Sequence, residues 1–162
     1  MITIRKNTFE TNSSSCHSIT FATGKPTNLP KDFVLSYDGE FGWSGSCYLP
    51  MDKASYYMIA MILWIEDDNR FPSFEEKVEE ITKRTNNLIE YARSVGVNMV
   101  LDGEMEFDED GYDIVKDMGY IDHQSAPSED IDCMGLAKMD AEDAFNWIFN
   151  GSACVDIDND NH

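Results

Sequence analysis

DKASYYMIAMILWIE, residues 52–66, is the stretch of sequence that decides the fold. Asp52 is a residue type that caps helix N-termini, and Tyr56, Ile59 and Leu63 follow at helical spacing. Apolar side chains occupy most of the helix circumference, so the pattern predicts a central helix that is buried on nearly all sides. The apolar run 56–65 is about half of the roughly 20 residues that a membrane span needs.

Two further helices are marked by their ends. Ser73 and Glu76 form a capping box that predicts the start of the second helix. Apolar residues follow at helical spacing as far as Val95, and Gly96 stands where a helix C-cap belongs. Asp140 is placed to cap a third, short helix over 141–149.

Short strands account for much of the remaining chain. They are predicted over 1–5, 17–21, 32–37, 97–101 and 153–157. A turn at Asp110 and Gly111 predicts an acidic hairpin between 105–107 and 112–115. This order of elements indicates an α+β fold, a mostly antiparallel sheet with two or three packed helices, and the length indicates a single domain over 1–162.

The net charge of −19 is concentrated in one part of the sequence. Residues 101–162, the acidic subregion, carry 18 carboxylates against only Lys116 and Lys138, a net charge of −16. Such a segment repels nucleic acid and anionic membranes and attracts cationic surfaces. We therefore expect no direct binding to nucleic acid or membrane. The expected partner is basic: a metal ion, or a protein surface that normally holds nucleic acid.

The predicted acidic hairpin is the candidate partner-binding surface. Its carboxylates are Glu104, Glu106, Asp108, Glu109, Asp110, Asp113 and Asp117. Carboxylates along both strands, with apolar residues between them as anchors, can occupy a groove that otherwise holds DNA. A surface that only keeps the protein soluble is the competing interpretation. The same run resembles the start of a calcium loop, but Glu106 stands at its first position and Asp113 replaces the usual apolar residue, so no dedicated metal site is expected.

A second constellation carries nucleophiles and histidines. Its members are Ser13, Ser14, Ser15, His17, Asp122 and His123. A serine or Cys16 would act as the nucleophile of a small hydrolase or group transferase, with His17 or His123 as the base. Cys16 and His17 point to opposite faces if they lie in a strand, so the partner has to come from the second segment. A polar turn whose hydroxyls bond to the backbone is the alternative.

The remaining composition narrows the class of protein. The four cysteines form no C-x-x-C pair and nothing indicates secretion, so we expect thiols and no disulfide framework. No motif specifies a nucleotide, flavin or haem, and no cofactor is expected. The first residues hold no apolar run of signal-peptide length, which predicts a cytoplasmic protein.

Four segments of the chain form a recognisable pattern. FETNSSSCHS at 9–18 is the most specific, followed by GEFGW at 39–43, YIDHQS at 120–125 and FNWIFN at 145–150. They resemble a family of uncharacterised proteins from bacteriophages and other mobile elements of Firmicutes, in which a small residue is expected in place of Cys16. The resemblance brings no established activity. It implies a mobile-element context, in which small acidic proteins often inhibit host defences, anti-CRISPR proteins among them.

The leading hypothesis is a non-enzymatic phage or mobile-element protein that binds and inhibits a basic nucleic-acid-handling host protein, with CRISPR effector nucleases among the candidates. It predicts binding that weakens with salt and competes with nucleic acid. The rival hypothesis is an enzyme built on the Ser/His/Asp constellation, which requires those groups to converge in one pocket. A third hypothesis is a metal-dependent regulator that uses the acidic loops.

Overall fold

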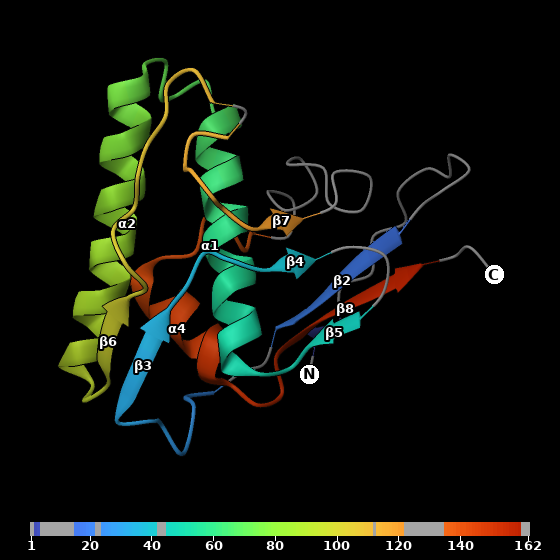
Figure 1. Ribbon diagram of the computed structural model, residues 1–162. Helices are drawn as coiled ribbons and strands as arrows, with labels where there is room; N and C mark the ends of the chain where they lie inside the picture. Colours follow the sequence, from blue (N-terminus) through green and yellow to red (C-terminus); the bar gives the residue numbers. More distant parts are fainter. Residues whose placement is uncertain are drawn as a thin grey trace.

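The computed structural model describes residues 2–3, 15–21, 24–41, 45–111, 113–121 and 135–159, with the backbone alone at 2–3, 15–18, 45–46 and 156–159. Within these residues the fold is α+β, as the sequence predicts. Its helices are α1 (Pro50–Asp67), α2 (Phe74–Ser94) and α4 (Ala141–Phe149). Figure 1 shows α1 and α2 side by side, with the shorter α4 lying across one end of the pair.

Helix α1 is the centre of the core. From Lys53 to Ile65 every side chain except Leu63 is buried, which confirms the prediction of a helix covered on nearly all sides. The predicted start at Asp52 is wrong, because Leu49 is the N-cap and Pro50 is the first helical residue. Proline fits that position because its fixed φ matches the helix and the first N–H has no partner within the helix.

Helix α2 confirms the predicted capping box. The Ser73 hydroxyl accepts a hydrogen bond from the Glu76 backbone N–H at 3.2 Å, and the Glu76 carboxylate accepts one from the Ser73 N–H at 3.1 Å. The helix ends at Ser94, and Gly96 follows at φ +92°, a left-handed conformation that favours glycine. Val95 lies beyond the last turn and is 41% exposed, so the prediction that it joins the buried face is wrong.

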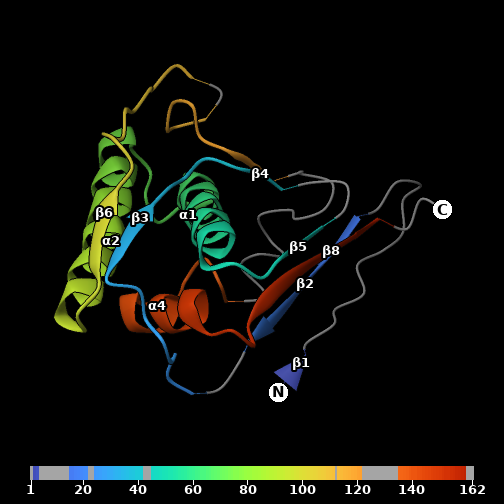
Figure 2. The same ribbon diagram turned by 60° about the horizontal axis from the view of Figure 1, so that its bottom comes forward.

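The main sheet is antiparallel and has four strands. Its spatial order is β1 (Ile2–Thr3), β2 (Ser15–Phe21), β8 (Cys154–Asn159) and β5 (Gly45–Cys47). Ile19 of β2 faces Val155 of β8 in the register, and both side chains are buried. Figure 2 shows this sheet on one side of α1, with α2 on the other.

The remaining strands form two parallel pairs, which the sequence did not predict. β3 (Asp32–Leu35) pairs with β6 (Asn98–Leu101), and β4 (Glu40–Phe41) pairs with β7 (Tyr120–Ile121). In the sequence, α1 and α2 both come between the two strands of each pair. Parallel strands need a crossover connection of a dozen or more residues, and the segment that holds both helices supplies it. The expected antiparallel arrangement therefore holds for the four-stranded sheet only.

A buried lysine ties α1 to the C-terminal part of the chain. The Lys53 ammonium donates hydrogen bonds to the backbone oxygens of Trp147 at 3.2 Å, Asn150 at 2.7 Å and Ala153 at 3.0 Å. Burial lowers the pKa of Lys53 to about 8. Three donors meet three acceptors at the negative end of α4, which offsets the cost of burying the charge. We call this arrangement the lysine clamp.

Candidate functional site

The predicted hairpin is an irregular loop, which we call the acidic loop (residues 102–117). A single antiparallel bridge joins Phe107 to Val115, with hydrogen bonds from the Asp108 N–H to the Ile114 oxygen at 3.0 Å and from the Lys116 N–H to the Glu106 oxygen at 2.9 Å. The prediction of two strands is therefore wrong. Carboxylates crowded on both sides of a turn repel one another, which disfavours a longer ladder. Buried Ile114 and Val115 anchor the loop to the core.

The structure places the predicted partner-binding carboxylates at the surface. Those that are exposed are Glu104, Glu106, Glu109, Asp110 and Asp117. Asp108 and Asp113 are half-buried, and the Asp108 carboxylate accepts a hydrogen bond from the Asp110 N–H at 3.1 Å. The loop thus presents most of its charge to solvent, where a partner can reach it.

Part of the acidic loop lines a pocket of about 210 Å³, which we call the acidic pocket. Its lining residues are Ser36, Tyr37, Asp38, Asp102, Glu104, Glu106, Lys116 and Asp117. Five of these are carboxylates, and Lys116 is the single cation among them. The Lys116 ammonium lies 3.5 Å from the Glu106 carboxylate, and both side chains are largely exposed, so the pair offsets little of the negative charge.

The parallel pairing of β3 and β6 brings the two halves of this pocket together. Leu35 and Leu101 are register partners at the ends of these strands, so the residues that follow each strand meet at one edge of the pair. The Asp102 N–H donates to the Leu35 backbone oxygen at 2.9 Å, and the Tyr37 hydroxyl donates to the Glu104 backbone oxygen at 3.3 Å. Sequence reasoning missed Asp38 and Asp102, because only the parallel pairing places them beside Glu104.

Tyr37 reports the electrostatics of the acidic pocket. Burial raises the pKa of its hydroxyl, and the neighbouring carboxylates of Asp102, Asp117 and Glu106 raise that pKa further. A negative potential disfavours the phenolate, so the part of the shift that comes from the carboxylates shares its physical cause with attraction of cations. The pocket is therefore suited to an ammonium or guanidinium group.

A second acidic contact lies where the loop packs against the end of α1. Burial, followed by the Asp113 and Asp67 carboxylates, raises the pKa of Glu66, while Lys77 and the Ile114 N–H act in the opposite direction. Burial also raises the pKa of Asp113. Carboxylates that are crowded and partly dehydrated prefer the protonated form, so protonation in mild acid relieves the crowding where the loop attaches.

The Ser/His/Asp constellation falls mostly outside the described residues. Ser13, Ser14, Asp122 and His123 lie outside them, as do Gly42 and Trp43 of the second resembling segment. Ser15 and His17 are in β2, where their backbones pair with Asn159 and Ile157. Convergence of these groups in one pocket stays a prediction from sequence.

The described residues offer few other kinds of site. Among them no group of three or more His, Cys, Asp or Glu side chains is arranged to hold a metal ion. No helix in the described ranges has the length and apolar character to cross a bilayer. Cys47 and Cys154 are buried thiols.

Comparisons with protein-family models, with curated proteins and with solved structures find no match for this chain.

Proposed function

We propose that this chain is a mobile-element protein that binds a basic, nucleic-acid-handling host protein and competes with its nucleic acid. The acidic loop would make the contact. The observation that carries the proposal is the acidic pocket, in which five carboxylates face one lysine. CRISPR effector nucleases are among the candidate partners, because small acidic inhibitors of host defences suit a mobile-element context.

The charge pattern supports competition with nucleic acid. DNA offers about one negative charge per 1.7 Å of helix axis, and proteins that hold it present rows of lysine and arginine. The exposed carboxylates of the acidic loop would occupy such a row, with Glu104, Glu106 and Asp117 next to the pocket and Glu109 and Asp110 at the turn. Tyr120, which is 49% exposed just beyond the loop, offers an aromatic anchor.

The loop is held firmly enough to present this charge. Buried Ile114 and Val115 anchor its second arm, and partly buried Met105 and Phe107 pack against the core from the first. The Tyr37 hydroxyl also links the segment after β3 to the Glu104 backbone oxygen. A preorganised surface loses less conformational entropy on binding, which favours affinity. Exposed charges contribute mainly to the rate and specificity of association, so we expect a steep dependence on salt.

The experiment is a pull-down from host lysate with matched triple variants. The loop variant carries Glu104→Gln, Glu106→Gln and Glu109→Gln. The control carries Glu75→Gln, Glu79→Gln and Glu90→Gln, three exposed positions of α2 with the same change in charge. We expect wild type and the control to retain a basic protein that duplex DNA displaces, and the loop variant to lose it.

Two results would contradict the proposal. One is equal retention of the same partner by the loop variant and the control, which would place the contact elsewhere. The other is a complex that survives high salt and excess DNA, which would exclude competition for a nucleic-acid groove.

A further inference from the structure

A second pocket of about 210 Å³ lies between α2 and the chain that leads into α4. Its lining includes Lys83, Arg84 and Asn87 from α2, Lys138 before α4, and Tyr57 from α1. We call it the basic pocket. Three cations and two carboxylates line it, in a chain whose net charge is −19. A local excess of cations inside so acidic a protein requires an explanation.

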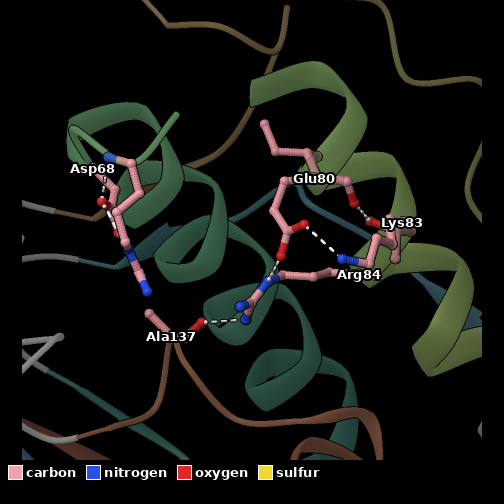
Figure 3. Close-up of polar contacts among 8 residues, drawn as sticks. Asp68, Glu80, Lys83, Arg84 and Ala137 are labelled. Atoms are coloured by element: carbon pink, nitrogen blue, oxygen red, sulfur yellow. Dashed lines mark hydrogen bonds and ion pairs between the residues drawn. The ribbon is translucent and has the colours of Figure 1, made fainter. Parts of the chain in front are cut away.

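The cations of the basic pocket are held in place by neighbours. Figure 3 shows the Glu80 carboxylate between Lys83 and Arg84, with ion pairs of 3.0 and 2.7 Å, and a hydrogen bond of 3.3 Å from Arg84 to the Ala137 oxygen. The Arg84 guanidinium also lies 4.9 Å from the centre of the Trp64 ring. These contacts leave Arg84 with little freedom, so its positive charge is fixed beside the pocket.

Lys138 and the start of α4 also add positive charge to the pocket. The Lys138 ammonium lies 5.6 Å from the centre of the Trp64 ring. The N-terminal end of the nine-residue helix α4, at Ala141, also borders the pocket. Asp140, the second carboxylate of the lining, accepts a hydrogen bond from the Asp143 N–H at 2.9 Å and so acts as the helix cap. Helix N-termini carry partial positive charge.

Tyr57 is the observation that points to a ligand. Its side chain is 2% exposed and lines the pocket, yet no residue in the described ranges forms a hydrogen bond with its hydroxyl. Leaving a buried hydroxyl unsatisfied is costly, and such groups in native proteins usually have a partner. Burial raises the pKa of Tyr57 to about 12, with Arg84 acting against that rise. The hydroxyl is therefore neutral at physiological pH and can donate a hydrogen bond.

We infer that the basic pocket binds a small oxyanion, a carboxylate or phosphate group, with Tyr57 donating to it and Lys83 and Lys138 supplying charge. Arg84 shapes the wall through its contacts with Glu80 and Trp64. A cation would meet a lining in which cations outnumber carboxylates, whereas an oxyanion supplies the acceptor that the Tyr57 hydroxyl lacks. The volume corresponds to roughly seven water molecules of about 30 Å³ each, which is ample for a phosphate or a small carboxylate.

The test is an NMR titration of the ¹⁵N-labelled full chain with sodium phosphate and, separately, sodium acetate. Sodium chloride at matched ionic strength corrects for screening, which is large in so acidic a protein. We expect saturable shifts of the Asn87 and Ala141 amides with at least one oxyanion. Response to phosphate alone or acetate alone supports the inference and identifies which group the site prefers.

Variants locate the site. Tyr57→Phe keeps the ring and removes only the unpartnered hydroxyl, so it should fold normally and weaken oxyanion binding about three- to tenfold. Lys83→Gln should weaken binding through loss of charge. Tyr91→Phe, which removes a hydroxyl outside the pocket, should bind as wild type does.

Three results would overturn the inference. The first is no shift beyond that caused by chloride. The second is equal affinity in wild type, Tyr57→Phe and Lys83→Gln, which would place the anion elsewhere. The third is marked destabilisation of Tyr57→Phe without added anion, which would mean that the hydroxyl already has a partner within the protein.

Discussion

The acidic pocket and the basic pocket have the same volume, about 210 Å³, and opposite charge. The acidic pocket is built from loops, and its Lys116–Glu106 pair is long and exposed. The basic pocket is built on helices, and Arg84 is held there by a carboxylate, a carbonyl and an indole ring. Charge that faces water can accumulate with little pairing, whereas charge beside a core has to be compensated. The first arrangement suits a broad, salt-sensitive interface and the second a small ligand.

If this contrast is right, the largest loss of stability should come from the lysine clamp, which fixes the helix that borders the basic pocket. Lys53→Met removes the ammonium donor from three backbone oxygens, of which that of Asn150 keeps a second donor, the Ala153 N–H, and should lower the free energy of unfolding by about 2–4 kcal/mol. Urea denaturation measures this loss. Relative to wild type, hydrogen exchange in the variant should accelerate more in α4 than in the acidic loop. Lys31→Met, at an exposed lysine, is the control. A loss equal to that of the control would show that the clamp contributes nothing.

The clamp also predicts a dependence on alkaline pH. The pKa of Lys53 is about 8 in the folded protein and near 10.5 when unfolded, so the unfolded state binds more protons between these values. The free energy of unfolding should therefore contain a Lys53 contribution that rises as pH increases from 8 to 10.5. Urea denaturation of wild type and Lys53→Met across this window isolates that contribution. Identical pH profiles would refute the lowered pKa.

A smaller effect is expected at the wall of the basic pocket. Arg84→Gln removes the ion pair with Glu80 and the contact with Trp64, and should lower the free energy of unfolding by about 1–2 kcal/mol. Arg93→Gln, at an exposed position of the same helix, should cost less than about 0.5 kcal/mol. If the two variants were equally stable by urea denaturation, Arg84 would be no better held than a surface arginine.

Mild acid should strengthen the attachment of the acidic loop. The pKa values of Glu66 and Asp113 are raised in the folded state, so the folded protein binds more protons than the unfolded chain above about pH 4.5. Stability should rise as pH falls from 7 toward 5. Below about 4.5 it should fall, as Glu80 and Asp68, whose pKa values are lowered, become protonated. Thermal denaturation follows both changes.

Glu66→Gln sharpens that test. The variant should melt roughly 1–3 °C higher than wild type at pH 7 and show a shallower rise on acidification. Glu75→Gln, an exposed change on α2, serves as the control for net charge. A melting temperature for Glu66→Gln no higher than that of the control would mean that crowding at the end of α1 has no energetic consequence.

The smallest effect is expected at Lys116. Its pair with Glu106 is long and solvent-exposed, so Lys116→Gln should change the free energy of unfolding by less than about 0.5 kcal/mol in urea. A loss comparable to that of Arg84→Gln would erase the distinction between the two pockets.

Local signals in the sequence were sufficient to predict that the three helices exist. The capping box at Ser73 and the cap at Asp140 act within one turn, so both appear in the structure as predicted. The start of α1 differs from the predicted one because Leu49, which has no capping side chain, is the N-cap, and Pro50 rather than Asp52 marks the first turn. Helix caps can be predicted from sequence because the residues that form each cap lie within a few positions of one another.

The pockets required contacts that no local pattern contains. Glu104, Glu106 and Asp117 were predicted from their own charge, but the parallel pairing of β3 with β6 was needed to add Asp38 and Asp102. The basic pocket was missed altogether. In the sequence, Tyr57 is indistinguishable from the other apolar positions of α1. Lys83 and Lys138 belong to segments that are distant in the chain, and only packing brings them together.

The lysine clamp has a consequence for how the chain is made. The acceptors of Lys53 lie 94, 97 and 100 residues further along the chain, so they are synthesised after it. A ribosome adds about 5–20 residues per second, so roughly 5–20 s pass before the last acceptor is synthesised. During that interval the central helix α1 carries an ammonium group whose backbone acceptors have not yet all been made. The native core therefore closes only after the chain has been made as far as Ala153, and a nascent chain that stops earlier cannot complete it.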